Sequence, residues 1–236
     1  MISRELDTTI GPKFLHIDNH DLLSAFSNAA SGAGADLDTR QAFTSTSGLI
    51  LTADLPDYTI DSTELGGKIT PRLWLKNNNN GRSAMAVGIG FFRFVCMNGL
   101  YIGVNMYGAK LIHRDGPKAN NILDLLPESL NTAMESIKSG AATDLLLDAA
   151  EQHVPDPVDV IGSLDINKTA KQQAIYIVAA EKHRWVDNPN TAWGLYNIVN
   201  EQVNRTTRSK FAAAERDMSL LENIQFLADN QVKIAV

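Results

Sequence analysis

The chain has 236 residues, of which 44% are hydrophobic and 20% are charged, a composition typical of folded globular proteins and unlike that of disordered chains. No apolar run approaches the roughly 18 residues of a membrane-spanning helix, and the N-terminus has no apolar core like that of a secretory signal. The sequence therefore predicts a cytoplasmic protein without a membrane partner. The single cysteine, Cys96, excludes an internal disulfide and a zinc site built on paired cysteines, and its apolar neighbours favour a buried thiol.

The net charge of −6 is unevenly distributed along the chain. Residues 68–118 hold eight basic residues and a single acid, Asp115, so this segment carries +7 while the remainder carries −13. Affinity for nucleic acid comes largely from lysine and arginine side chains that displace counterions from phosphates. The segregated charge therefore indicates a polyanion-binding segment in an otherwise anionic protein.

Residues 1–40 are predicted to be a lead-in with one short helix over residues 21–30, because Asp18 and Asn19 are N-cap residue types. The stretch His16-Ile17-Asp18-Asn19-His20 also places two potential metal ligands on one side of an extended segment. No third convergent ligand lies nearby in the sequence. We therefore favour helix capping and predict neither a metal nor another cofactor.

Residues 41–117 are predicted to form an antiparallel β-meander of about three to five strands. Residues 42–60 fit one or two strands at a sheet edge, interrupted by Pro56. Strict alternation follows over residues 68–76, where one face is basic and the other apolar. The apolar face is expected to pack on the core.

Two turn signals divide the rest of this sheet. Asn77 to Asn80 followed by Gly81 predict a hairpin onto a strand over residues 82–96, in which Gly88 and Gly90 indicate a bulge. Asn98-Gly99 predicts a second tight turn, which leads into a strand over residues 100–113.

Beyond residue 117 the spacing of apolar residues changes from two to about 3.6, the helical period. We predict that residues 118–236 form a helical half that packs on the sheet, within a single α+β domain. Pro127 marks the start of its first helix and Gly140 the end. Further helices are expected around a break at Pro155-Asp156-Pro157, over residues 143–153, 167–184, 191–203 and 207–229.

The basic face of residues 68–76 also carries an aromatic ring, that of Trp74. Single-stranded nucleic acid is held by cations that follow the phosphates and by rings on which bases stack, at about 1–3 kcal/mol per base. The alternative is that a helix covers Trp74 and that lysine and arginine stems surround it. The predicted contacts of this surface are Lys68, Arg72, Trp74, Lys76, Arg82, Arg93, Tyr101, Tyr107, Lys110, Arg114 and Lys118.

Catalytic motifs are absent from the sequence: it has no P-loop, no GxSxG, no HExxH and no dinucleotide fingerprint, so we predict that the protein is not an enzyme. Asp144 and Asp148 lie one helical turn apart and fit a solvated helix face. A smaller basic group is suited either to phosphate contacts or to pairing with nearby acids, and consists of Arg205, Arg208, Lys210 and Arg216.

Several runs resemble the phage/plasmid-like family known as domain of unknown function 932. They are PRLWLKNNNNGRSA, FFRFVCMNGLYIG, HRDG and TAWGLYNIVNE, and the resemblance covers residues 70–201. It implies a mobile-element protein in a bacterial cytoplasm and no established activity. Members of the family commonly carry a Ser-x-Asp-Gly-Ser hairpin tip where this chain has Asn78-Asn79-Asn80-Gly81-Arg82-Ser83. A meander followed by a long helix also resembles, in architecture alone, phage single-strand annealing proteins.

These observations favour a phage-type, homo-oligomeric protein that holds single-stranded DNA and promotes annealing in recombination. A second hypothesis is an interaction protein that binds a host or defence protein through its acidic surface. A third is a hydrolase or nuclease whose site is assembled from distant acids.

Overall fold

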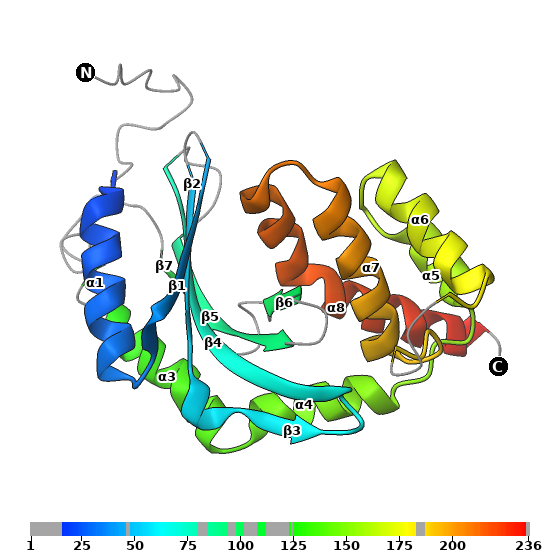
Figure 1. Ribbon diagram of the computed structural model, residues 1–236, viewed down its shortest axis with the longest axis horizontal. Helices are drawn as coiled ribbons and strands as arrows, with labels where there is room; N and C mark the ends of the chain where they lie inside the picture. Colours follow the sequence, from blue (N-terminus) through cyan, green and yellow to red (C-terminus); the bar gives the residue numbers. More distant parts are fainter. Residues whose placement is uncertain are drawn as a thin grey trace.

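A computed structural model describes residues 16–45, 48–79, 85–93, 98–101, 108–111, 123, 125–182 and 187–234 (Figure 1). An antiparallel sheet occupies the first half of the chain, and helices occupy the second. The predicted α+β class, a sheet followed by a mostly helical half, is confirmed.

The sheet has the order β1-β2-β4-β5, with every described pairing antiparallel. The short strand β3 pairs with the start of β4, whereas β6 and β7 pair with opposite ends of β5. A 3₁₀ turn, η1 (Pro56–Tyr58), interrupts the chain at the predicted Pro56. The strands are β1 (Asp36–Thr44), β2 (Gly48–Asp54), β3 (Ile60–Ser62), β4 (Gly67–Asn78), β5 (Met85–Arg93), β6 (Asn98–Tyr101) and β7 (Gly108–Leu111).

Side-chain caps begin several of the helices. Asp18, Asn167 and Thr191 each accept a hydrogen bond from a backbone N–H of the first turn, as N-cap residues do. Helix α5 starts at Pro157, where the sequence analysis predicts a break, because proline is well tolerated in a first helical turn. The helices are α1 (Asn19–Gly32), α3 (Leu126–Lys138), α4 (Ala141–Glu151), α5 (Pro157–Ser163), α6 (Lys168–Ala179), α7 (Ala192–Thr206) and α8 (Lys210–Ile234).

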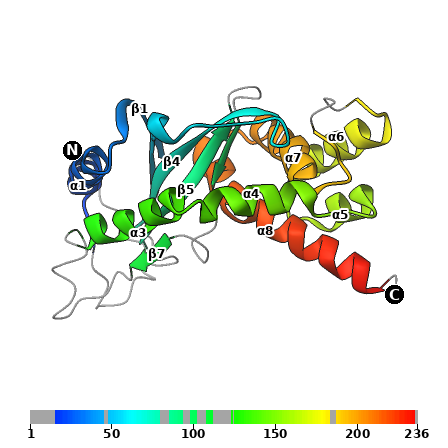
Figure 2. The same ribbon diagram turned by 90° about the horizontal axis from the view of Figure 1, so that it is seen from below.

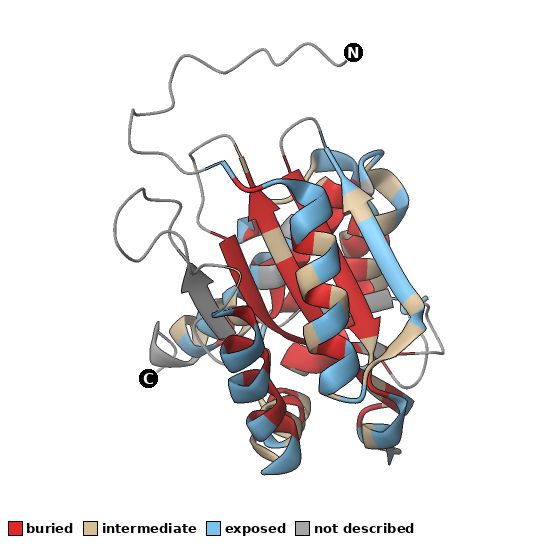
Figure 3. Cartoon of the chain, turned by 90° about the vertical axis from the view of Figure 1, so that its left-hand side faces the viewer, coloured by how far each residue is buried: buried red, intermediate tan, exposed pale blue. Residues whose placement is uncertain are grey.

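Helices α1 and α3 cover one face of the sheet (Figures 1 and 2). Leu73 and Leu75 of β4 point to this side and are fully buried, as the alternation predicts. In Figure 3, α1 crosses in front of buried strands, while the outer strand β1 is largely exposed. Asn79, at the end of β4, exchanges two hydrogen bonds with the backbone of Ile17 and so holds the start of α1 against the sheet.

The opposite face of the sheet is covered by the N-terminal part of α8. Phe211 and Ala214 of α8 pack with Ile50, Trp74 and Ala86 in a second apolar cluster. Because helices cover both faces of the central strands, the prediction of an open basic face along β4 is wrong. The alternative, a tryptophan beneath a helix, describes the structure.

Gly88 serves this packing instead of forming the predicted bulge. The register between β4 and β5 continues without a shift from Ile69 opposite Arg93 to Lys76 opposite Ala86. Gly88 lies opposite Trp74, and a Cβ atom at this position would lie 2.8 Å from the Trp74 Cζ2 atom. Glycine is therefore required here by the close approach of the indole ring.

Within the described ranges, none of the helices combines the length and apolarity needed to cross a bilayer.

Replacement of Trp74 by alanine is expected to lower the free energy of unfolding by about 3–5 kcal/mol, because a large buried ring is lost. Phe226→Ala is the matched control: Phe226 is 66% exposed, and its removal should change stability by no more than about 0.5 kcal/mol. Urea unfolding followed by circular dichroism measures both. Equal midpoints for Trp74→Ala and the wild type would contradict the buried position of the ring.

Candidate functional site

Trp74 is fully buried and belongs to the core of the protein. Its indole Nε1 donates a hydrogen bond to the backbone carbonyl of Ile89 at 2.6 Å, which satisfies the only polar group of the ring. Phe211 and Ala214 of α8 pack over it. The expectation that bases stack on Trp74 is therefore corrected, because the ring is not accessible to a ligand.

Arg72 forms an ion pair with an acid of the neighbouring strand. Its Nε and Nη2 atoms lie 2.8 and 2.7 Å from Oδ1 of Asp54, the residue opposite it on β2. The Arg72 side chain is 3% exposed, so the expected phosphate contact is corrected as well. Burial raises the pKa of the Asp54 carboxyl above its usual value, and the Arg72 guanidinium opposes that rise.

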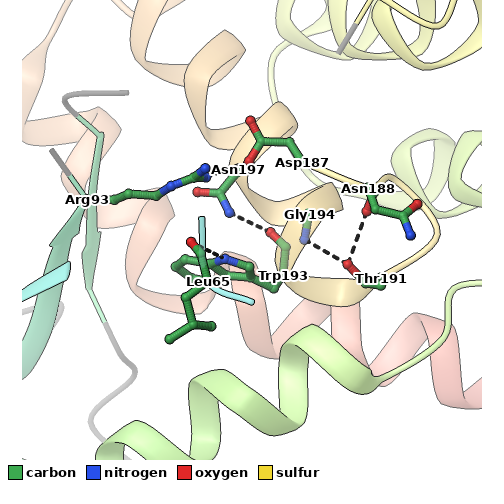
Figure 4. Close-up of polar contacts among 8 residues, drawn as sticks. All are labelled: Leu65, Arg93, Asp187, Asn188, Thr191, Trp193, Gly194 and Asn197. Atoms are coloured by element: carbon green, nitrogen blue, oxygen red, sulfur yellow. Dashed lines mark hydrogen bonds and ion pairs between the residues drawn. The ribbon is translucent and has the colours of Figure 1, made fainter. Parts of the chain in front are cut away.

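Arg93 forms a second internal ion pair, which joins the sheet to the helical half. Its Nη1 atom lies 2.5 Å from Oδ1 of Asp187, and the two side chains are 2% and 4% exposed. Figure 4 shows Arg93 reaching from β5 toward Asp187, which precedes α7. The expected contact of Arg93 with a phosphate is therefore corrected as well, because the carboxylate of Asp187, from the helical half, neutralises this arginine.

The run TAWGLYN builds the other side of this junction. Thr191 caps α7 by accepting a hydrogen bond from the Gly194 N–H, and Gly194 lies so close to the Asn188 backbone that a Cβ atom would not fit (Figure 4). Trp193 Nε1 donates to the Leu65 carbonyl at 3.2 Å, while its ring stacks on Tyr196. These residues therefore have structural roles at the contact between sheet and helices.

A buried polar network continues from this junction and joins α7 to α8. The Tyr196 hydroxyl donates to Asp217 Oδ1 at 2.5 Å and accepts from Asn200 Nδ2 at 2.7 Å. Asn204 Nδ2 donates in turn to Asn200 Oδ1. A hydrogen-bonded network of this kind fixes the packing of two helices more closely than apolar contacts alone.

The remaining residues of the predicted surface lie in several places. Lys68 is exposed at the start of β4, and Lys76 is partly exposed near its end. Tyr101 belongs to β6 and Lys110 to β7, but the structure describes only the backbone of these two residues. Also outside the described residues are Arg82, Tyr107, Arg114, Lys118 and the thiol of Cys96.

The fold assembles a different group of cations where α6, α7 and α8 meet. Asn167 Nδ2 donates to the hydroxyls of Thr206 and Thr207, at 3.0 and 3.3 Å, and so holds the start of α6 against the turn between α7 and α8. Arg216 Nη1 donates to the same Thr207 hydroxyl at 3.5 Å. We call the cations in and around this contact the basic cluster, which consists of Lys76, Lys168, Arg208 and Arg216.

Two cations of the basic cluster line an open pocket of about 380 Å³. Lys76 of β4 and Arg216 of α8 both line it, although they are far apart in the sequence. Its size is at the lower end of the range of about 300–1,000 Å³ that is usual for ligand pockets. This α8 pocket is lined by Lys76, Leu164, Asp165, Ile166, Ala212, Arg216, Ser219, Leu220 and Asn223.

The sequence indicates Lys76 and, in a separate group, Arg208 and Arg216, but it does not indicate that Lys76 and Arg216 line one pocket. Lys168 and the pocket residue Asp165 carried no signal in the sequence, because each is an ordinary charged residue beside a helix start. In the described part of the chain, no three His, Cys, Asp or Glu residues come together as a metal site would require. Within the stretch from His16 to His20, which the sequence analysis considers for metal binding, Asp18 caps α1.

The family model described as a domain of unknown function (DUF932) matches residues 8–225. The chain belongs to this family. The matched segment contains the sheet, the junction at Arg93 and the whole of the α8 pocket. No solved structure matches the chain.

The Arg93–Asp187 pair provides a sharp test of the junction. Asp187→Ala is expected to cost about 3–5 kcal/mol in unfolding free energy, because it leaves the buried Arg93 charge without its carboxylate. The control is Glu135→Ala on α3, which removes the carboxylate of an exposed pair with Lys138 and should cost no more than about 1 kcal/mol. Thermal and urea unfolding report both. Similar losses in the two variants would show that the junction does not depend on this pair.

Proposed function

We propose that this protein binds single-stranded nucleic acid and that the phosphates of the strand contact the basic cluster. The observation that carries the proposal is the convergence of Lys76 and Arg216 on one open, polar pocket. Lys168 and Arg208, both exposed, adjoin the hydrogen bonds from Asn167 to Thr206 and Thr207. Together these side chains supply the cations that phosphate binding requires, in place of the buried Arg72 and Arg93.

Helix ends add to the positive potential of this region. Helix α6 begins directly after its Asn167 cap, and α8 begins at Lys210, just after Arg208. The N-terminus of a helix carries a partial positive charge and favours nearby anions. Phosphates on the basic cluster would therefore experience both the side-chain charges and the dipoles of two helices.

Holding a strand requires no covalent chemistry, so we propose a binding protein and not an enzyme. Copies of the protein that carry complementary strands would bring them together and promote annealing. This role accords with the resemblance to phage annealing proteins noted from the sequence. It implies a homo-oligomer in a bacterial cytoplasm, which we also propose.

The double variant Arg208→Ala/Arg216→Ala is expected to bind an oligothymidylate of twenty nucleotides at least about tenfold more weakly than the wild type at low salt. Its plot of log affinity against log salt should be shallower by about 1.4, since each lost phosphate contact removes about 0.7 from the slope for single strands. Fluorescence anisotropy at several salt concentrations measures both quantities.

The matched control for this experiment is Lys138→Ala/Lys182→Ala, which removes the same charge from exposed residues of α3 and of the segment after α6. It should retain most of the affinity. Absence of binding by the wild type at low salt, or equal losses in both double variants, would refute the proposed function.

The acidic surface favours a second candidate function, the binding of a host or defence protein. Helices α4 and α5 and the segment joining them contain no lysine or arginine, and their five acids are all exposed. A basic protein partner would meet acidic side chains here without competing lysines or arginines from the same segment. The five acids are Asp144, Asp148, Glu151, Asp156 and Asp159.

This second function predicts a partner that remains bound to the immobilised protein after nuclease treatment and elutes as salt is raised. The variant Asp144→Asn/Asp148→Asn/Glu151→Gln should lose that partner, because it removes three charges from exposed positions of α4. Retention of the same protein by the variant, judged by mass spectrometry, would count against the acidic surface.

A further inference from the structure

The α8 pocket has two kinds of wall. Ile166 and Ala212, both partly exposed, provide an apolar floor, and the buried Leu164 and Leu220 lie behind them. The remaining lining residues are polar or charged, namely Lys76, Asp165, Arg216, Ser219 and Asn223. The pocket thus offers an apolar surface, two cations and several hydrogen-bonding groups to one ligand.

We propose that the α8 pocket seats one complete nucleotide of the bound strand, with its phosphate on Lys76 and Arg216 and its base on the apolar floor. This inference rests on the proposed function and deepens it. A basic surface alone would contact only the phosphates, whereas the pocket would also bind a base. The ligand class is therefore a nucleotide unit, and not merely a polyanion.

The order of polar residues along α8 supports this arrangement. Arg216, Ser219 and Asn223 are spaced by three and four residues and are all exposed, so they lie on one face of the helix. Arg216 and Asn223 are separated by about 10 Å along the helix axis, at 1.5 Å per residue. The pocket therefore has a cationic end at Arg216 and an amide end at Asn223. A ligand with an anionic part and a neutral part would place the anionic part at the first end and the neutral part at the second.

The neutral end of the pocket matches the edge of a base. The Asn223 amide offers both a donor and an acceptor, and the Asp165 carboxylate accepts hydrogen bonds from exocyclic amino groups. The Asn167 cap fixes the segment that carries Asp165, because its side chain bonds both to the Ala170 N–H and to the turn between α7 and α8. The segment that carries Asp165 is therefore held in place before a ligand enters.

The test compares two single-stranded DNA oligomers, each ten units long and with the same number of phosphates. One consists of natural deoxynucleotides, and the other of abasic tetrahydrofuran units. Wild-type protein should bind the natural oligomer about tenfold or more tightly, because a seated base adds contacts. Ser219→Trp fills the pocket from an exposed helix position and should reduce this difference to less than about twofold, because it weakens binding of the natural oligomer more than binding of the abasic one.

Two further variants complete the experiment. Asn223→Leu keeps the size of the side chain and removes the amide, so it should also weaken binding of the natural oligomer alone. Thr132→Trp, on an exposed position of α3, is the control and should behave as the wild type. Equal affinity of the wild type for both oligomers, or equal weakening of both by Ser219→Trp and Asn223→Leu, would overturn the nucleotide pocket while leaving phosphate binding intact. Failure to bind either oligomer would refute the proposed function itself.

Discussion

The ion pair between Arg93 and Asp187 fixes how the two halves of this protein meet. It is buried at both ends, and it joins the central strand β5 to the segment that leads into α7. Helix α7 is buried on all sides over Ala192 to Asn200, and its polar network holds α8 in turn. The position of Arg216 beside Lys76 therefore depends on a chain of contacts that begins at this pair, because α8 carries Arg216 and the sheet carries Lys76.

Local pattern was sufficient to predict the class of fold and the inward face of β4. Alternation over residues 68–76 correctly assigned Leu73 and Leu75 to the core, since the period of two is a property of the strand itself. What covers the other face is decided by Phe211 and Ala214, which lie far along the chain, and no local pattern connects them with Trp74. A strand whose sequence alternates between polar and apolar residues can thus be buried on both faces, provided that each buried cation has a carboxylate partner.

The net charge of residues 68–118 gave a wrong prediction of a basic surface for the same reason, namely that the partners lie far away in the sequence. The excess of +7 in residues 68–118 is real, yet Arg72 and Arg93 are paired internally with Asp54 and Asp187, two acids that lie outside that segment. Composition registers both members of such a pair but not their contact. The candidate site shows the converse: the sequence indicates Lys76 and Arg216 separately, and the packing of Phe211 and Ala214 of α8 against Trp74 of β4 brings their two elements together.

The outer strand β1 limits how copies of this chain can associate. Its pairing with β2 is interrupted by a register shift between Asp36 and Gln41, and it exposes Asp38 and Arg40 along its length. Irregular, charged edge strands resist the addition of a strand from another molecule. A continuous sheet running from one subunit into the next is therefore disfavoured at this edge. Self-association is better suited to helical surfaces, among them that of α8.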